Sequence, residues 1–469
     1  MFKRLSVVPG LLMISLGLAG CGDSGEDGNL EGISTLDTTA GDDVGTSEGS
    51  TGDGDMGTTA DTSTGDGDTT TTTDGTTTTD GGTTTDGGTT TGGDPIDNLP
   101  PSDQPPGNLS PSEVPMFVSF GWDDNAYSGL EGSGGTGGMH WSTEMVKSRT
   151  NPAGSGQSAT YDGAPVTMSY YFTGTYIGAW QSESPTYVKR SWRAAYDEGH
   201  EIGNHTYSHP HGSAYSVAQW TPELSDTLDW LTKPHDPNEI DFEPDDTKGI
   251  GVPLAEIYGF RTPYLEYNDN TLTVQEELGF LYDCSIEEGW QPEQDGTNYN
   301  WPFTLDNGSP GHDVLVSWDL KEPITPHPGL WELPVHPVIV PPDAACAQYG
   351  IPTGLRAKLK ALVSWFDEGS GKITGFDYNL WVSFGLTKEE FVATLSYTLD
   401  QRLAGNRAPF MFGTHTDYYS SKYTAPMNST AQERREAMEA FLDYALSKPE
   451  VRVVSNKQIL DWVRQPVAL

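Results

Sequence analysis

The sequence predicts an α/β fold, with a parallel sheet or an α/β barrel, over residues 111–469. The first observation is that short β-type runs alternate with segments of helical periodicity, which favours parallel strands joined by helices. The second is that conspicuous polar residues stand where predicted strands end, and in α/β barrels that edge of the sheet holds the active site. The third is length, because a segment of this size is sufficient for one large domain with long loops.

The predicted strands are apolar or alternating runs rich in aromatic and β-branched residues. They cover residues 115–122, 165–172, 200–206, 256–264, 281–286, 329–340 and 408–415, and a last strand and helix share residues 451–463. Segments with helical spacing separate them, at 184–199, 274–280, 388–405 and 432–448. The first two of these end at glycines, Gly199 and Gly279, which are usual helix stops.

Four groups of polar residues lie at the ends of predicted strands. They are Asp123 with Asp124, His205 with His209, Arg261, and His415. Two imidazoles four residues apart can lie on one side of a helical turn or tight loop, and with one carboxylate they suit Zn²⁺ while leaving a position open for water. A metal lowers the pKa of bound water to roughly 7, and a nearby base completes the deprotonation. The Asp pair supplies a carboxylate for each task, so the pattern predicts a metal site.

The N-terminus has the features of a secretory signal. Lys3 and Arg4 precede an apolar run over residues 5–19 that is short for a bilayer span. Residues 18–21, LAGC, resemble a bacterial lipobox, which implies a signal peptide over 1–21 and a lipid anchor on Cys21. Gly22 replaces the Asp that often marks inner-membrane retention. We therefore expect an extracytoplasmic protein, lipid-anchored to the cell membrane, and in the outer membrane if the cell is Gram-negative.

Residues 22–110 are predicted to be a disordered linker. They consist mainly of Thr, Gly, Asp and Ser, with runs such as TTTTTDGTTTTDGG and no apolar periodicity. Such a chain cannot bury enough surface to offset its ordering entropy, so it reads as a flexible stalk.

The net charge of −42 argues against a nucleic-acid partner, because nucleic-acid binding requires a basic surface. Besides Cys21 the chain has two cysteines, Cys284 and Cys346. Two cysteines can pair in an oxidising compartment, but the sequence leaves open whether these two meet.

The motifs resemble those of the polysaccharide deacetylases, carbohydrate esterase family 4, which share the NodB homology domain. SFGWDDN is similar to the family's first motif, HTYSH and RTPY are similar to the second and third, and FGTH resembles the late strand that ends in histidine. RTPYLEYNDN, FLYDCSI and NRAPFMFGTH resemble the arthropod chitin deacetylases in particular. The resemblance covers nearly all of residues 114–465 and implies a distorted (β/α) barrel.

The resemblance also implies a role for each site residue. The metal, zinc or another divalent ion such as Co²⁺, would be held by Asp124, His205 and His209. Asp123 would be the general base, and Arg261 would pair with it and orient it. The backbone N–H of Tyr264 would help to bind the oxyanion, and His415 would protonate the leaving amine.

The chain departs from the family pattern at two points. Trp122, a bulkier residue than usual before the Asp pair, is expected to reshape the floor of the site. The acidic residue that tunes the catalytic histidine is expected in YDCSIEEGW, where Asp283 and Glu287 are both open. Trp290, Trp301 and Trp331 are expected in the core, although an exposed aromatic residue near the site would stack on a sugar ring.

The implied function is metal-dependent hydrolysis of N-acetyl groups from an N-acetylglucosamine-containing polysaccharide, such as chitin, chitooligosaccharide or the glycan of peptidoglycan. One alternative is an acetyl-xylan or other O-acetyl esterase that uses the same site. The other is a surface carbohydrate-binding lipoprotein without catalysis. Asp123 and the three metal ligands are all present, which favours an enzyme, because pseudoenzymes commonly lose the base or a ligand.

Overall fold

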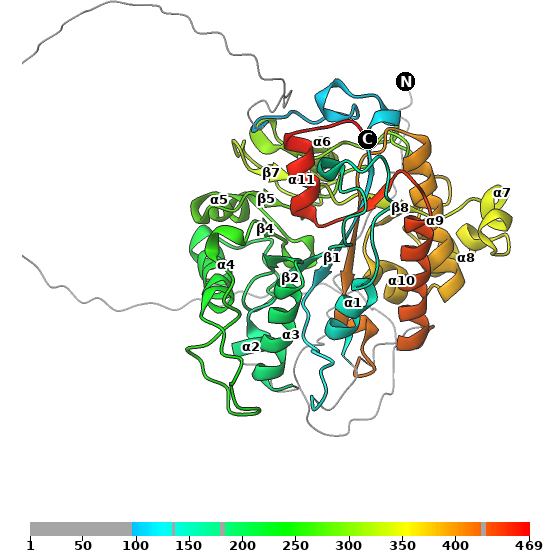
Figure 1. Cartoon of the computed structure of the whole chain (residues 1–469). Coiled ribbons are helices and arrows are strands. Elements are labelled where there is room, and N and C mark those ends of the chain that lie inside the picture. Colours follow the sequence, from blue (N-terminus) through cyan, green and yellow to red (C-terminus); the bar gives the residue numbers. More distant parts are fainter. Residues whose placement is uncertain (1–95, 134–136, 179–182, 424–427) are drawn as a thin grey trace, which may run out of the picture. The chain divides into compact units, whose positions relative to one another are not determined.

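The computed structural model describes residues 96–133, 137–178, 183–423 and 428–469 (Figure 1). The predicted signal peptide with Cys21 and most of the predicted linker lie outside these residues. A search of the described residues finds no helix with the length and apolar character needed to cross a membrane.

The strands and helices alternate along the chain. The strands of the main sheet are β1 Met116–Asp123, β2 Ser169–Phe172, β3 Glu201–Asn204, β4 Gly259–Phe260, β5 Tyr282–Asp283, β6 Phe303–Thr304, β7 Trp331–Glu332, β10 Phe410–His415 and β11 Val451–Val453. A second, two-stranded sheet consists of β8 Pro337–Ile339 and β9 Lys372–Thr374. The helices are α1 Gly138–Val146, α2 Thr175–Gly178, α3 Pro185–Asp197, α4 Val217–Thr232, α5 Asp269–Leu278, α6 Pro310–Ser317, α7 Asp343–Cys346, α8 Leu355–Leu362, α9 Lys388–Ala404, α10 Ala431–Leu446 and α11 Asn456–Arg464.

The main sheet is parallel except at one edge. Its strands follow the order β10-β1-β2-β3-β4-β5-β7-β6, with β11 also paired to β1, and only the β6–β7 pair is antiparallel among these described strands. The chain continues from β7 into β8, and β9 reaches β10 through a single parallel bridge between Phe376 and Gly413. The predicted distorted (β/α) barrel is confirmed. The main sheet is curled, and the β8–β9 pair closes the gap between its two ends, where no continuous ladder of hydrogen bonds forms.

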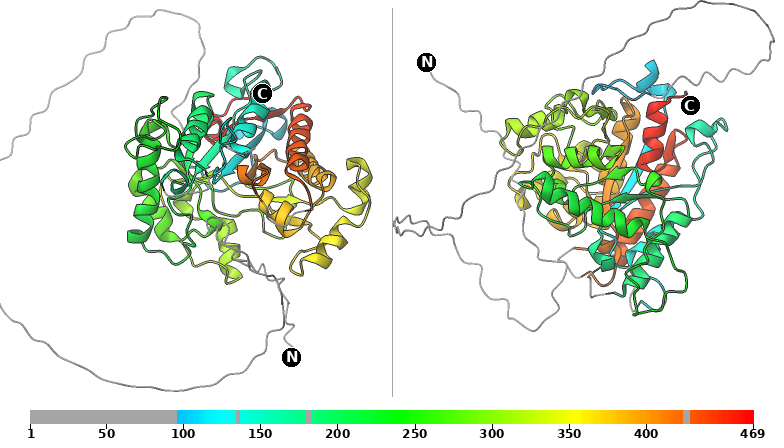
Figure 2. Two further views of the ribbon diagram at one scale, coloured as in Figure 1. Left: turned by 90° about the horizontal axis from the view of Figure 1, so that it is seen from below. Right: turned by 90° about the vertical axis from the view of Figure 1, so that its left-hand side faces the viewer.

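Helices cover the sheet from outside. In Figure 1, α2, α3 and α4 lie to one side of β1, and α9 and α10 lie to the other. Seen from below in Figure 2, the helices stand around the strands. This arrangement buries the strands, and the loops that carry the polar motifs follow the C-terminal ends of the strands.

The alternation of side chains along β1 decides which residues face the barrel interior. All eight residues of β1 are buried. Phe120 and Trp122 pack in the large core between the sheet and the helices. Phe117 points the other way and packs in an inner core with Tyr171. Successive side chains of a strand point to opposite faces, so Asp123 shares the inner face with Phe117.

The domain begins earlier than the predicted boundary at residue 111. The Ile96 N–H donates to the Arg464 carbonyl oxygen at 2.9 Å, and the Trp301 N–H donates to the Ser102 carbonyl oxygen at 2.9 Å. Ile96 and Leu99 also pack against the inner core. The polar, proline-rich composition of residues 96–110 masked these apolar anchors, which secure the segment to the domain.

Other element boundaries differ for local reasons. Helix α5 starts at Asp269 instead of residue 274, because the side chain of Asn268 accepts the Thr271 N–H at 3.0 Å and caps the helix. The predicted strand over 329–340 is divided between two sheets, since Pro334 interrupts the run and proline cannot donate to a ladder. Helices α1, α4, α6 and α8 were not predicted.

Candidate active site

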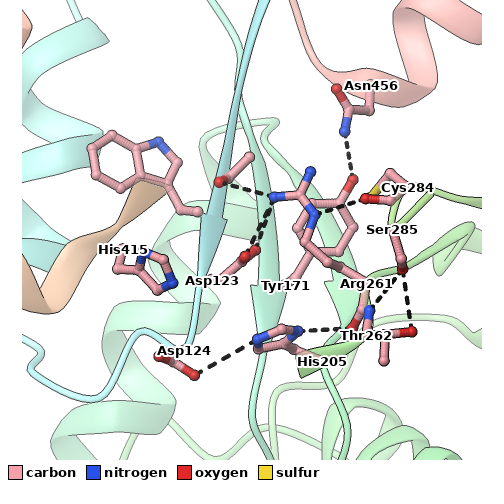
Figure 3. A network of polar contacts seen from close by, with 12 residues as sticks. Asp123, Asp124, Tyr171, His205, Arg261, Thr262, Cys284, Ser285, His415 and Asn456 are labelled. Atoms are coloured by element: carbon pink, nitrogen blue, oxygen red, sulfur yellow. Dashed lines mark hydrogen bonds and ion pairs between the residues drawn. The ribbon is translucent and has the colours of Figure 1, made fainter. Parts of the chain in front are cut away.

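The C-terminal ends of β1, β3, β4 and β10 meet at one edge of the sheet (Figure 3). In the β1–β10 ladder, Asp123 is the direct partner of His415. His205 follows β3 and Arg261 follows β4, and Nδ1 of His205 lies 2.8 Å from the carbonyl oxygen of Arg261. Asp123 and His415 are therefore neighbours although they are 292 positions apart in the sequence, as the strand-end pattern predicted.

Asp124, His205 and His209 form a group whose ligand atoms all lie within 4.8 Å of one another. Nε2 of His209 lies 3.4 Å from Oδ1 of Asp124, and Nε2 of His205 lies 3.8 Å from the same oxygen. The contact of His205 Nδ1 with a carbonyl oxygen fixes a proton on Nδ1 and leaves Nε2 free to bind a metal. Burial and the nearby His209 lower the pKa of His205 to about 3, so its ring is neutral at pH 7. A neutral imidazole is the metal-binding form, and the three residues therefore suit a divalent cation.

Backbone conformation at this edge is unusual. Among the described residues, eleven other than glycine have positive φ, and six of them belong to the loops that carry the site. These six are Asp124, Asn125, Thr206, His209, Tyr264 and Leu265. Residues other than glycine adopt this region at an energetic cost that the surrounding structure must offset, and such residues gather at functional sites.

Asp123 and Arg261 form a buried ion pair. Nη1 of Arg261 lies 3.2 Å and 3.4 Å from the two carboxylate oxygens of Asp123, and both side chains are at most 3% exposed. Burial raises the pKa of Asp123 to about 6, and the Arg261 charge opposes that rise. The arginine thus holds the carboxylate in one orientation while its pKa stays close to neutrality, as a general base requires.

Arg261 is itself held from three sides. Its Nε donates to the Cys284 carbonyl oxygen at 3.1 Å. The guanidinium lies over the ring of Tyr171, 4.8 Å from the ring centre, and 5.1 Å from the ring centre of Phe376. Cys284 and Cys346 are both buried and unpaired, so the disulfide left open by the sequence does not form in this structure.

His415 is paired with an aspartate that the sequence analysis missed. Nδ1 of His415 lies 2.7 Å from Oδ1 of Asp377, and the His415 N–H donates to Oδ2 of the same side chain at 3.1 Å. Burial acts to lower the pKa of His415, but the charge and hydrogen bond of Asp377 outweigh it and raise the pKa to about 9. His415 is therefore protonated at neutral pH.

The two acidic candidates named for this task lie elsewhere. Asp283 accepts hydrogen bonds from Ser285 and Gln275, at 2.7–2.9 Å. Glu287 accepts from the Thr374 hydroxyl at 2.7 Å. Asp377 occupies the position beside His415 because β9 runs next to β10, and the one sequence signal was a lone acidic residue after a short apolar run, GFDY.

A second missed carboxyl group lies near the metal-ligand group. Oδ1 of Asp417 accepts the Ala126 N–H at 3.1 Å, and Asp417 is buried. Burial, followed by the charge of Asp124, raises the pKa of Asp417 to about 8. Asp417 comes two residues after His415 and fixes the loop that follows Asp124.

Tyr264 lies beside the histidine cluster. Its ring stacks on His211 at a centroid distance of 4.0 Å and meets the edge of His209 at 4.6 Å, and the residue is 45% exposed. Its side chain thus forms part of the rim of the site. The oxyanion role expected for its backbone N–H stays a prediction.

Trp122 does not form the floor of the site, contrary to expectation. It is fully buried on the outer face of β1, where Nε1 lies 3.1 Å from the Met168 sulfur and its ring stacks on Tyr170. The alternation along β1 directs Trp122 and Asp123 to opposite faces, so the bulk of Trp122 is absorbed by the core.

Residues 162–282 match the family described as polysaccharide deacetylase. This segment of the chain belongs to that family, which is carbohydrate esterase family 4. The matched segment contains His205, His209 and Arg261, whereas Asp123, Asp124 and His415 join them through the fold.

The individual relatives of this chain are distant. It is 24% identical over 220 residues to chitin deacetylase 8 of Bombyx mori, in an alignment that spans 46% of this chain and 46% of the silkworm protein. A solved structure from Mycobacterium smegmatis, assigned to the polysaccharide deacetylases, is 17% identical over 78% of this chain and 95% of its own, with a TM-score of 0.41. A family 4 acetyl xylan esterase from Clostridium thermocellum, solved with a cobalt ion, is 15% identical over 39% of this chain and 64% of its own, with a TM-score of 0.23.

Proposed function

We propose that this chain is a metal-dependent hydrolase that removes N-acetyl groups from a polysaccharide containing N-acetylglucosamine. Chitin, chitooligosaccharide and the glycan of peptidoglycan all belong to this substrate class. The observation that carries the proposal is the meeting, at one sheet edge, of a three-ligand group, a buried carboxylate paired with arginine, and a protonated histidine.

The donor set fits a divalent ion, for which we propose zinc, with cobalt as an alternative. Asp124, His205 and His209 would hold it, and two nitrogens with one carboxylate oxygen leave positions open for ligands from outside the protein. When bound, such an ion would supply Lewis acidity, which polarises the acetyl carbonyl group and favours ionisation of water.

Asp123 would take a proton from the attacking water. Its carboxylate is inaccessible to bulk solvent and held by Arg261, so the oxygen that accepts the proton has a fixed position. Arg261 cannot lose its own proton in this setting, because burial acts to lower its pKa but the Asp123 charge and other contacts outweigh that effect and raise the already high pKa further. The ion pair therefore orients the base without competing for the proton.

His415 would give a proton to the departing nitrogen as the C–N bond breaks. Asp377 holds Nδ1, so Nε2 is the atom available for donation. The Tyr264 N–H would contribute to binding the oxyanion, on the strength of the RTPY motif. An amine is a poor leaving group without a proton, so the charged His415 favours amide hydrolysis over hydrolysis of an oxygen ester.

The metal assignment is tested by metal analysis of the purified full chain and of His205→Ala and His209→Ala variants. We expect one equivalent of zinc in the parent and a large loss in either variant. Stoichiometric metal in a protein that carries both substitutions would remove the assignment.

The substrate class is tested by acetate release from a panel of N-acetylated and O-acetylated glycans. We expect faster turnover of chitooligosaccharides or peptidoglycan glycan than of acetylated xylan. Preference for acetylated xylan would make the protein an O-acetyl esterase, and turnover of neither would leave a carbohydrate-binding protein.

We further propose that Cys21 anchors the protein to a membrane on the extracytoplasmic side, in the outer membrane if the cell is Gram-negative. The LAGC sequence and the preceding basic and apolar segments support this proposal. Cys21→Ser should move the protein from the membrane fraction to the soluble fraction. Retention of that variant in the membrane fraction would contradict a lipid anchor at this residue.

A further inference from the structure

A hollow of about 550 Å³ lies outside the catalytic group, and aromatic rings form much of its wall. The aromatic residues that line it come from four separate stretches of the chain, namely Trp290, Trp318, Trp365 and Tyr397. All four are half-buried, so each ring is held by the protein and still meets solvent. Its volume falls within the range of sites for small ligands.

The hollow lies toward the sheet edge opposite to the catalytic edge. Strand β9 runs parallel to β10 where Phe376 bridges Gly413, so its first residue, Lys372, is remote from the catalytic end, which Asp377 reaches. Lys372 lines the hollow. Helix α9 leads back to the start of β10, and its second half contributes Tyr397. The positions of β9 and α9 therefore place the hollow away from His415. The hollow shares no lining residue with the catalytic group.

The two cations in the wall are used to hold the loops. Nζ of Lys372 donates to the carbonyl oxygens of Gly289 and Gln291 at 2.7 and 3.1 Å, beside Trp290. The Arg356 guanidinium donates to the carbonyl oxygens of Glu368 and Gly369, at 3.0 and 2.7 Å, in the loop after Trp365. These contacts pre-organise the aromatic walls and lower the entropy that a ligand would have to offset.

Three other polar residues of the wall, Gln294, Asp295 and Asp367, present acceptor oxygens. Gln294 lines the hollow and is 7% exposed, and its Oε1 atom has no hydrogen-bond partner among the residues that the structure describes. A buried amide oxygen without a partner is costly, which indicates that a donor from a ligand completes it. Asp295 and Asp367 are exposed on the rim, where they would repel an anionic ligand.

We propose that this hollow is a second carbohydrate site, which binds a segment of a neutral polysaccharide remote from the catalytic edge. A pyranose ring presents C–H faces that pack on indole and phenol rings, and its hydroxyl groups supply the donors that Gln294 lacks. The rim carboxylates and the net charge of −42 disfavour nucleic acid and acidic glycans. Binding here would retain the protein on a polymer without placing an acetyl group at the catalytic edge.

The test is binding of the full chain to insoluble chitin and cellulose, compared with acetate release from N,N′-diacetylchitobiose. Trp318→Ala with Trp365→Ala should weaken polymer binding at least about tenfold, given the usual strength of aromatic contacts. Hydrolysis of the disaccharide should stay within about twofold of the parent, since neither residue lies in the catalytic group. Phe242→Ala is the matched control, because Phe242 is 69% exposed and lies outside the hollow.

A second variant keeps the test valid if the protein with both tryptophan substitutions does not fold. Gln294→Leu keeps the volume of the side chain and removes Oε1, and it should also weaken polymer binding while the thermal unfolding temperature is retained. Polymer binding that is unchanged in both folded variants, or absent in the parent for both polymers, would overturn the inference. The readout is independent of the proposed function, because a catalytically inactive protein would still bind polymer through the hollow.

Discussion

Nδ1 of His415 lies 2.7 Å from Oδ1 of Asp377, while Oδ2 of Asp377 accepts the backbone N–H of the same histidine at 3.1 Å. One carboxylate therefore fixes both the ring and the main chain of the residue that ends β10. Asp377 is inaccessible to solvent, so water screens its charge little, and that charge raises the pKa of His415 to about 9 against the effect of burial.

Asp377→Asn should move the alkaline limit of activity to lower pH. Removing the charge lets burial dominate, so the pKa of His415 should fall from about 9 toward its ordinary 6.5 or below. A general acid works only while protonated, so activity at pH 8 should drop roughly tenfold or more, with a smaller loss at pH 6. The measurement is kcat/KM on a chitooligosaccharide from pH 5 to pH 10.

Asp283→Asn is the control for this prediction, because Asp283 was the candidate from the sequence and is equally buried. Its contacts are to Ser285 and Gln275, so the variant should keep the alkaline limit of the parent whatever its effect on stability. An alkaline limit that moves in Asp283→Asn and stays fixed in Asp377→Asn would reverse the assignment.

His415→Ala should separate amide substrates from ester substrates. Loss of a general acid costs roughly a hundredfold or more when the leaving group needs a proton, as an amine does. A phenolate leaves without one, so hydrolysis of an aryl acetate should fall much less. Metal content should be retained. Equal losses on both substrates, or no loss on the amide, would remove His415 from the mechanism.

The two adjacent carboxylates should respond differently to the same substitution. Asp123 pairs with Arg261, whereas Asp124 lies with His205 and His209. Asp123→Asn should retain metal and lose turnover by roughly a hundredfold or more. Asp124→Asn should lose metal first and recover part of its activity at raised zinc concentration. The opposite pattern would show that the carboxylates have exchanged roles.

Much of the candidate site was predictable because its parts are local. The side chains of Asp123, His205 and His415 each stand at the end of an apolar run, and parallel strands bring such ends to one edge. A short motif that follows a strand therefore indicates both the type of functional side chain and its place at the edge of the sheet. The strand-end pattern therefore predicted that these residues share one edge, without knowledge of the strand order. The pairing of Asp123 with Arg261 came from the family resemblance and not from this pattern.

Asp377 was beyond such reasoning because its position depends on a contact between distant segments. It lies 38 residues before His415 and follows β9, a strand of three residues that is separated from β8 and from β10 by long connecting segments. Trp122 shows the complementary limit. The size of Trp122 suggested an effect on the site. The direction of its side chain depends on the alternation along β1, however, and Trp122 points to the outer face because Asp123 points to the inner face.

Stability has its own buried ion pair, between Asp162 and Arg452 of β11. Oδ1 of Asp162 lies 3.0 Å from Nε and 2.6 Å from Nη2 of Arg452, and both side chains are inaccessible to solvent. The same carboxylate accepts the N–H groups of Gly156 and Gln157 at 3.0 Å. It thus ties the loop after α1 to the strand that pairs with the start of β1.

Asp162→Asn should lower the free energy of unfolding by about 3 kcal/mol at pH 7, because it leaves the Arg452 charge buried without its partner. Asp443→Asn, which breaks the exposed pair with Arg149, is the control and should cost at most about 1 kcal/mol.

Burial acts to raise the pKa of Asp162, but its hydrogen bonds, the one with Arg452 foremost, lower the pKa from 3.8 to about 2. The stability that this ionised group contributes is complete above pH 3.8 and is lost as the pH falls through 2, so the deficit of Asp162→Asn should be smaller at pH 3 than at pH 6. Urea unfolding at both pH values measures this, and a deficit that is unchanged or larger at pH 3 would mean that ionisation of Asp162 does not stabilise the fold.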